Sequence, residues 1–290
     1  MSGRTARKIL VTNDDGIHSL GLKLLWDAVR PLGKTIIFAP ETPKSASGLG
    51  ITLHKPLRIQ RVKYWGTTVY ATNGTPSDII YLALNEISPK LDLVVSGVNV
   101  GDNTSVQVIL SSGTVGAAAQ AALLGIPSIA FSAAVEDAEE FSDPNYYNSI
   151  MVVAREISRF VLENGLPEGI HVLNVNFPRR IHEGTRVRIA RVAPIKFLQR
   201  VNVNYDPRGN KYYWLYGMMA DPIPGTDVYY VHVEESITIS PLQLDLNPRN
   251  TDEALSKYLE SMTASIKRIL DRLPEKGDIE AGEAVAGGKP

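Results

Sequence analysis

The chain has 290 residues, enough for one large α/β domain or two smaller ones. Hydrophobic residues make up 44% and charged residues 21%, which excludes wholesale disorder and a collagen-like chain. Lys and Arg total 30 and Asp and Glu total 31, so no overall field draws the chain to a nucleic-acid polymer or an anionic membrane. The sequence has no cysteine, which excludes disulfides, cysteine-ligated metals and thiol nucleophiles.

The sequence also lacks the signals of a membrane or secreted protein. No apolar run reaches the ~18 residues that a membrane-spanning helix needs. The start carries Arg4, Arg7 and Lys8, and a strand-like segment follows instead of the apolar core of a signal peptide. We therefore expect a cytoplasmic protein with no membrane partner and no nucleic-acid partner.

The first half of the chain alternates short apolar runs with helical stretches. The runs at 9–12, 35–39, 93–95 and 128–131 predict strands, and apolar residues at helical spacing predict a helix at 20–29. Because these runs are apolar on both faces, they indicate a mostly parallel sheet covered by helices on both faces. The predicted fold class is therefore α/β.

Two further helix starts are marked by their capping residues. Thr75 can cap a helix in which Pro76 occupies the first position and Asp78 the first turn. Thr114 is expected to open a second helix, which Gly125 ends as its C′ residue.

The second half of the chain changes in character. A long helix is expected at 146–163 and another strand at 171–176. A β-hairpin is expected from 201 to 216, because Asp206-Pro207-Arg208-Gly209-Asn210 is a turn sequence between two strand-like runs. Residues 228–242 are rich in strand-forming residues, and Thr251 is expected to cap an amphipathic helix.

Ligands of open parallel sheets bind beyond the carboxyl ends of the strands, so the residues that follow each strand are the candidates for a site. Three such segments, at 13–16, 44–48 and 96–103, are polar and contain glycine. All three can converge on one crevice.

The adjacent carboxylates of Asp14 and Asp15 are the sharpest feature of these segments. Two carboxylates near ~4 Å repel by roughly 4 kcal/mol at a surface-like dielectric. Together with Ser45 and Asn99 they would supply the hard oxygen ligands that suit Mg²⁺, Mn²⁺ or Ca²⁺. The alternative is that Asn-Asp-Asp-Gly is only a turn, which spacing alone slightly favours for a single loop. The coincidence at three strand ends favours a site.

A helix start at Ser111-Ser112-Gly113-Thr114 offers free backbone N–H groups and hydroxyls to an anion, although a plain N-cap is the commoner use in isolation. A metal site and this helix start in one crevice indicate metal-assisted phosphoryl chemistry. The motifs of a P-loop ATPase, a dinucleotide enzyme and an α/β-hydrolase are absent from the sequence.

The candidate segments belong to an ordered series of motifs: Asn13-Asp14-Asp15-Gly16, Lys44-Ser45-Ala46-Ser47, Gly74-Thr75-Pro76-Ser77-Asp78, Ser96-Gly97-Val98-Asn99 and Ser112-Gly113-Thr114-Val115. Their order and spacing over about residues 8–132 resemble the SurE survival-protein family. A second stretch, which includes Pro224-Gly225-Thr226-Asp227, also fits that family.

The resemblance implies a Rossmann-like domain and a divalent-metal-dependent phosphomonoesterase that hydrolyses nucleoside 5′- and 3′-monophosphates. It implies one Mg²⁺ or Mn²⁺ per subunit, held by Asp14, Asp15, Ser45 and Asn99, with the two aspartates as the catalytic residues. Other small phosphomonoesters are expected substrates as well. The residues expected to hold the phosphate are Lys44, Asn103, Ser112, Gly113 and Thr114.

The resemblance also implies a dimer or tetramer that exchanges C-terminal segments. Residues 1–195 would form the catalytic domain. Residues 196–274 would form an oligomerisation region made of the hairpin and an extended helical arm from Thr251 to about Leu273. Residues 275–290, rich in Gly, Ala and Glu, are expected to be a disordered tail.

Two residues depart from the family pattern. Lys44 stands where Arg is common and loses bidentate phosphate geometry. Ser111 stands where an aromatic residue or His is common, which leaves base preference open.

Because the two acids are adjacent and followed by Gly16, attack by water is favoured over an aspartyl-phosphate on Asp15. A non-catalytic metal- and nucleotide-binding sensor and a metal-dependent glycosyltransferase stay open as other functions.

Overall fold

The computed structural model describes residues 6–247 and 253–270. The chain divides into two compact units, Met1–Leu244 and Asp245–Pro290. The first unit holds every strand of the described residues and all of the candidate site residues.

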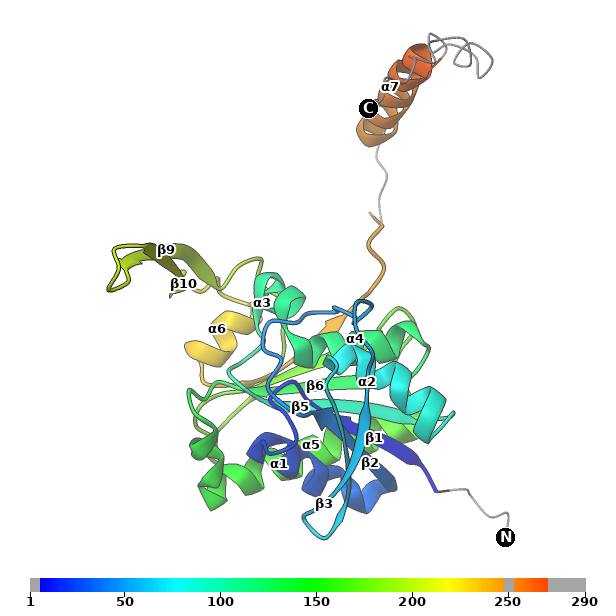
Figure 1. The fold of residues 1–290 in the computed structure, drawn as a ribbon, viewed down its shortest axis with the longest axis vertical. Helices are drawn as coiled ribbons and strands as arrows, with labels where there is room; N and C mark the ends of the chain where they lie inside the picture. The colour runs from blue at the N-terminus through cyan, green and yellow to red at the C-terminus, as the bar shows by residue number, and fades with distance from the viewer. Residues whose placement is uncertain (1–5, 248–252, 271–290) are drawn as a thin grey trace, which may run out of the picture. The chain divides into compact units, whose positions relative to one another are not determined.

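Nine strands of the first unit form one sheet in the spatial order β3-β4-β2-β1-β5-β6-β7-β11-β8 (Figure 1). The strands from β4 to β7 are parallel to one another, whereas β3 is antiparallel to β4 and β11 is antiparallel to β7. The bounds are β1 Lys8–Thr12, β2 Lys34–Pro40, β3 Ile59–Tyr64, β4 Thr67–Thr72, β5 Leu93–Val100, β6 Ser128–Ala133, β7 Val172–Phe177, β8 Val187–Ile189 and β11 Ile237–Leu242.

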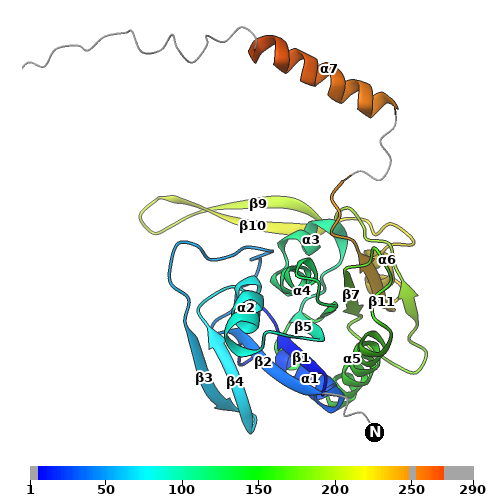
Figure 2. The same ribbon diagram turned by 90° about the vertical axis from the view of Figure 1, so that its right-hand side faces the viewer.

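Helices cover both faces of this sheet (Figure 2). On one face α1 (Leu20–Val29) packs against α5 (Pro144–Asn164), and on the other α2 (Pro76–Leu82) packs against α4 (Gly113–Leu123). The remaining helical elements of the described residues are η1 Arg30–Leu32, η2 Ala83–Ile87, α3 Ser105–Ser111, η3 Ala138–Ser142, α6 Asp227–His232 and α7 Glu253–Leu270. The predicted α/β class, with a mostly parallel sheet and helices on both faces, is confirmed.

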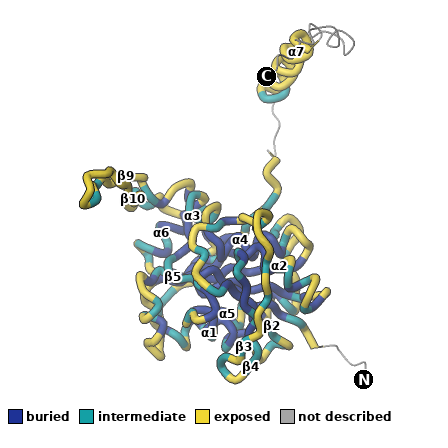
Figure 3. Tube along the Cα trace, in the orientation of Figure 1, coloured by how far each residue is buried: buried dark blue, intermediate teal, exposed yellow. Residues whose placement is uncertain are grey.

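The strand β1 shows why its residues are apolar on both faces. Ile9 and Val11 belong to the core cluster under α1 and α5, whereas Leu10 belongs to the cluster under α2 and α4. All three side chains are fully buried, as Figure 3 shows for the centre of the sheet. A strand that is covered on both sides therefore reads as a continuous apolar run.

The capping residues behave as predicted at α2 and differently at α4. Thr75 and Asp78 form a complete capping box at the start of α2. At α4 the N-cap is Ser112, whose hydroxyl accepts a hydrogen bond from the N–H of Val115. The prediction that Thr114 opens this helix is wrong, since Thr114 lies inside the first turn and its hydroxyl is used elsewhere.

The interpretation of 228–242 as rich in strand is confirmed for only part of the segment. Residues Asp227–His232 form the helix α6, and only Ile237–Leu242 form a strand. Thr226 caps α6 by accepting from the N–H of Tyr229, and the helix buries Val228 and Val231 on one side. Tertiary packing thus overrides the strand propensity of these β-branched and aromatic residues.

The predicted hairpin is confirmed and is longer than expected. The strands β9 (Phe197–Tyr205) and β10 (Lys211–Met219) pair along their whole length. Asp206 closes the turn by accepting from the N–H groups of Arg208 and Asn210. Almost every residue of both strands is exposed, including Trp214 and Leu215, and the hairpin projects away from the main sheet (Figure 2).

The second unit contains α7, an amphipathic helix with no buried residue. Its exposed apolar side chains include Leu259, Met262 and Ile266. The expected cap at Thr251, the expected end near Leu273 and the tail at 275–290 lie outside the described residues.

A search of the described ranges finds no single helix long and apolar enough to cross a membrane. Among these residues, only α3 and α4 taken together are long and apolar enough, and they form a pair bent by 75°.

Replacing Thr75 by Ala should lower the free energy of unfolding by about 1 kcal/mol, because the N–H of Asp78 loses its hydrogen-bond acceptor at the start of α2. Urea denaturation measures this change. Thr42→Ala, at an exposed threonine outside any helix, is the control and should leave the midpoint unchanged. Equal midpoints for wild type and Thr75→Ala would contradict the capping role.

Candidate active site

The acidic pair lies in a tight turn at the carboxyl end of β1. The side chain of Asn13 accepts a hydrogen bond from the N–H of Gly16 at 3.1 Å and donates one to the carbonyl of Gly16 at 3.3 Å. Gly16 has a φ of 96°, a conformation that favours glycine. This turn fixes Asp14 and Asp15 between β1 and α1.

The loops after β1 and β2 meet the start of α4 at one place. The N–H of Lys44 donates to the carbonyl of Asp14 at 2.7 Å, and the N–H of Gly48 donates to the carbonyl of Ser111 at 3.0 Å. A Cβ added to Gly113 would lie 2.6 Å from Ser47 Oγ and 2.8 Å from Asp14 Cβ. The expected convergence of strand-end segments on one crevice is therefore observed for these loops.

Side-chain contacts bring the segment after β5 into the same place. The hydroxyl of Thr114 donates to Asp14 Oδ1 and lies 3.4 Å from Asn99 Oδ1. The amide nitrogen of Asn99 donates to the carbonyls of Val100 and Gly101, so its oxygen is the atom turned toward Thr114. The N–H of Val100 donates to Asp15 Oδ2 at 3.4 Å. Asp14, Asp15, Asn99 and Thr114 thus form one connected group.

Burial makes the two carboxylates costly to ionise. Asp14 is 4% exposed, and desolvation raises the pKa of its carboxyl even though Thr114 donates to it. Burial, and then the negative charge of Asp14, raise the pKa of Asp15 to about 7. Among the described residues no Lys, Arg or His forms an ion pair with either carboxylate.

The donor set fits a hard divalent cation. Two carboxylates and the amide oxygen of Asn99 are oxygen ligands of the kind that Mg²⁺ and Mn²⁺ prefer. Ser45 lies exposed on the loop whose neighbouring Lys44 N–H binds the carbonyl of Asp14. Across the described parts of the chain no cluster of three or more His, Asp or Glu side chains offers a competing metal site.

The residues expected to hold phosphate fall into two groups, those beside Asp14 and the buried Asn103. Ser112, Gly113 and Thr114 lie at the start of α4 next to Asp14, and Lys44 lies on the adjoining loop. Asn103 is 4% exposed instead, and its amide nitrogen donates to Ser132 Oγ at 2.7 Å. One of the two N–H donors of the Asn103 amide is thus used within the protein.

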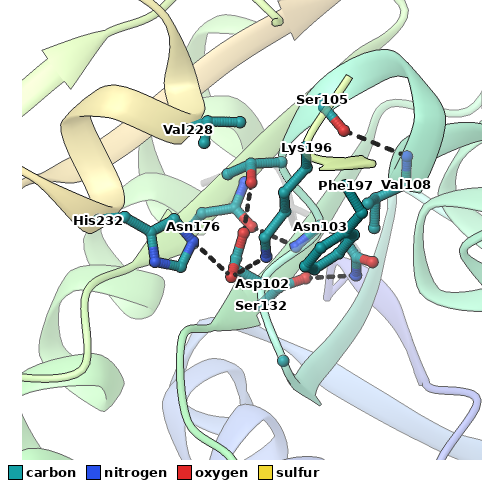
Figure 4. Close-up of polar contacts among 12 residues, drawn as sticks. Asp102, Asn103, Ser105, Val108, Ser132, Asn176, Lys196, Phe197, Val228 and His232 are labelled. Carbon is teal, nitrogen blue, oxygen red and sulfur yellow. Dashed lines mark hydrogen bonds and ion pairs between the residues drawn. The ribbon is translucent and has the colours of Figure 1, made fainter. Parts of the chain in front are cut away.

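A buried ionic cluster beside Asn103 was not predicted from the sequence. Asp102 Oδ2 accepts from Lys196 Nζ at 2.6 Å and lies 3.0 Å from His232 Nε2, while the hydroxyl of Thr104 donates to Oδ1 (Figure 4). Burial alone would raise the pKa of Asp102, but the hydrogen bond from His232 and the charge of Lys196 hold it well below its usual range.

A second carboxylate, that of Asp227, ties the same segment to the chain's later part. Its two oxygens accept from the N–H groups of Ser105 and Ala193, each at 2.9 Å. The Asp102 and Asp227 contacts together fix the segment that follows Asn99 against residues 193–197 and α6. Because Lys196 and His232 are 94 and 130 residues from Asp102, no local motif reveals the cluster.

The fold and the site define a doubly wound α/β protein whose acidic, oxygen-rich site lies at the carboxyl edge of the sheet. The family described as "Survival protein SurE" matches residues 9–198. This chain belongs to the SurE family, and the resemblance inferred from the motifs is confirmed.

Individual relatives agree with this assignment. The chain is 63% identical over 249 residues to the 5'-nucleotidase SurE of Hyperthermus butylicus, covering 85% of this chain and 88% of that protein. It is 51% identical to the 5'-nucleotidase SurE of Pyrobaculum arsenaticum, covering 89% and 100%. The crystal structure of the SurE protein from Aquifex aeolicus matches with a TM-score of 0.73 at 33% identity, covering 87% of this chain and 99% of that one.

Replacing Asp102 by Asn should lower the free energy of unfolding by about 3 kcal/mol at pH 7, because it leaves the buried Lys196 ammonium without a counter-charge. The folded-state pKa of Asp102 is lowered, so its contribution is present above the unfolded pKa of about 3.9 and is lost as the pH falls below it. The difference between the two proteins should therefore shrink from pH 7 to pH 3.

Urea denaturation at pH 7, 5 and 3 measures this dependence. Asp221→Asn removes an exposed carboxylate and is the matched control, which should track the wild type at each pH. A cost of Asp102→Asn that stays constant over the range would contradict the ionic role of Asp102.

Proposed function

We propose that this chain is a divalent-metal-dependent phosphomonoesterase that hydrolyses nucleoside 5′- and 3′-monophosphates to nucleoside and phosphate. The observation that carries the proposal is the pair of adjacent carboxylates, buried Asp14 and partly buried Asp15, beside the first turn of α4. The names of the relatives as 5'-nucleotidases support it. Other small phosphomonoesters would enter the same site.

The residues that would hold the metal are Asp14, Asp15, Ser45 and Asn99, with one Mg²⁺ or Mn²⁺ per subunit. When bound, the cation would neutralise negative charge on the phosphoryl oxygens. The cation would also relieve the mutual repulsion of the two carboxylates. Without the cation, this repulsion contributes to the raised pKa of Asp15.

The start of α4 would bind the phosphoryl group. Ser112, Gly113 and Thr114 offer backbone donors, and Ser112 also a hydroxyl, at the N-terminus of the 11-residue helix α4, where the helix dipole favours an anion. Lys44 would contribute a positive charge from the adjoining loop. A contact from Asn103 stays a prediction, since its amide nitrogen donates to Ser132.

Asp15 would orient the attacking water. A carboxylate beside the attacking water can accept a proton from it while the water oxygen forms the new bond to phosphorus. The bond from phosphorus to the ester oxygen then breaks, and the leaving oxygen takes up a proton. Recovery of a phosphorylated Asp15 after rapid quenching would contradict attack by water.

The exposed apolar surfaces support a homo-oligomer, a dimer or tetramer. The hairpin β9–β10 exposes Trp214 and Leu215, and α7 exposes Met262 and Ile266. Solvent-exposed apolar surface of this kind is typical of an interface between subunits. Residues 196–274 would then serve oligomerisation by segment exchange, residues 1–195 would serve catalysis, and the protein would act in the cytoplasm.

Phosphate release from a panel of nucleoside 5′- and 3′-monophosphates tests the function. Release should be lost after treatment with a chelator and restored by Mg²⁺ or Mn²⁺, because charge neutralisation dominates phosphoryl transfer. Binding of the monophosphates without release of phosphate would indicate a sensor. A requirement for a sugar acceptor would indicate a glycosyltransferase.

Replacing Asp14 by Ala should lower turnover by about 10²-fold or more, since it removes a ligand and the acceptor of the Thr114 hydroxyl. The melting temperature without metal should stay equal or rise, because one of two repelling carboxylates is gone. The rise in melting temperature that Mn²⁺ gives the wild type should disappear.

Thermal melts with and without Mn²⁺, together with turnover, measure these effects. Glu183→Ala removes an exposed carboxylate and is the control that should match the wild type in both assays. An Asp14→Ala protein with unchanged turnover would end the assignment of Asp14 as a ligand.

A further inference from the structure

A cavity of about 380 Å³ lies at the edge of the sheet opposite the acidic pair. Lys8 and Lys34, the first residues of β1 and β2, line it together with Lys63 of β3, while Asp14 follows the last residue of β1. Hydroxyl-bearing residues complete the wall, whereas no Asp or Glu lines it. The lining residues of this kind are Thr35, Thr67, Thr68, Tyr70 and Ser88.

The register of the sheet places these lysines on one face. Lys8 pairs with Lys34 across the parallel strands β1 and β2, and both lie on the face that carries Leu10 and Ile36. Lys63 pairs with Thr68 across β3 and β4. Like charges directly opposite each other on neighbouring strands are destabilising, so the Lys8–Lys34 pair requires compensation from elsewhere.

The protein supplies only neutral partners for these ammonium groups. Lys8 Nζ donates to Ser88 Oγ at 3.1 Å, and Lys63 Nζ donates to Thr68 Oγ1 at 3.0 Å. Within residues 6–247 and 253–270, none of the three lysines has a carboxylate within 4.0 Å.

Some lysines elsewhere in the described residues, and the carboxylate of Asp92, have partners of their own. Lys23, Lys196 and Lys257 each form an ion pair. Asp92 is engaged with the backbone N–H of Lys8 and with Arg7, and it does not line the cavity. The positive charge of the cavity is therefore uncompensated by the chain itself.

The spacing of the strands sets the size of a complementary ligand. Neighbouring strands lie about 4.8 Å apart, so the positions of Lys8 on β1 and Lys63 on β3 are separated by three strand intervals, roughly 14 Å. The backbone positions of the three lysines are thus spread along the wall, and their three positive charges exceed the charge of a monovalent anion. A compact anion with several charged groups matches this charge, and the volume suits a small ligand.

We propose that this cavity is a second binding site, separate from the acidic pair, for a multivalent oxyanion such as an inorganic oligophosphate or a tricarboxylate. The three lysines supply the charge, and Ser88 and Thr68 supply hydroxyls that hold two of the ammonium groups in place. No residue of the acidic crevice lines this cavity, so anion binding in the cavity does not require the hydrolytic activity.

Isothermal titration calorimetry of the full-length, metal-free protein at low ionic strength tests this site. The metal-free protein lacks the cation that we propose to hold a phosphoryl group at the acidic pair, which disfavours anion binding there. Inorganic triphosphate and citrate should each bind saturably with one site per chain, and binding should weaken as salt is added. Acetate, with a single charge, should not bind saturably.

The triple variant Lys8→Gln, Lys34→Gln, Lys63→Gln should bind triphosphate about tenfold more weakly or not at all. The matched triple variant Lys55→Gln, Lys211→Gln, Lys267→Gln removes the same charge at exposed lysines elsewhere and should bind as the wild type does. If the first triple variant fails to fold by circular dichroism, the double variant of the exposed Lys34 and Lys63 replaces it.

Absence of saturable binding to the wild type would overturn the proposal, as would equal weakening in both triple variants or equal binding of acetate and triphosphate. Because the titration is done without metal and without turnover, its result is independent of the nucleotidase assay. Failure of one does not imply failure of the other.

Discussion

The placement of two adjacent carboxylates, one buried and one partly buried, is the constraint on which the site depends. Asp14 and Asp15 are held together by the turn between Asn13 and Gly16, by the Lys44 N–H and by the Thr114 hydroxyl. Each contact comes from a different segment, so the three loops must fold together before the two carboxylates are held in this position. The carboxylates repel each other and are desolvated, so the cation that we propose to bind beside them would remove an unfavourable charge interaction.

The close approach of α4 to this pair requires a small residue at its start. Any side chain at position 113 would overlap Ser47 Oγ and Asp14 Cβ, both within 2.8 Å of its Cβ position. Gly113 therefore allows the helix N-terminus and its hydroxyls to approach the acidic pair directly. A cation site and an anion site in contact are what phosphoryl transfer needs, because the metal and the helix can contact the same group.

The sequence predicts those parts of the fold whose signals are local. The strand at Lys8–Thr12 is predictable because both of its faces are buried, and the cap at Thr75 because its partner Asp78 is three residues away. The acidic pair is found for the same reason. The helix α6 is missed because its fold depends on packing of Val228 and Val231, and the ion pairs of Asp102 are missed because their partners are distant in sequence.

The parallel sheet also separates charge, since all of its strands start at one edge and end at the other. Lysines that begin β1 and β2 gather at one edge, and aspartates that follow β1 gather at the opposite edge, although the net charge of the chain is only −1. The stretch from Lys8 to Asp14 spans at most roughly 20 Å of extended chain, whereas the Debye length at physiological salt is about 8 Å. The strand length therefore lets the two edges carry opposite potentials and bind ligands of opposite charge independently of each other.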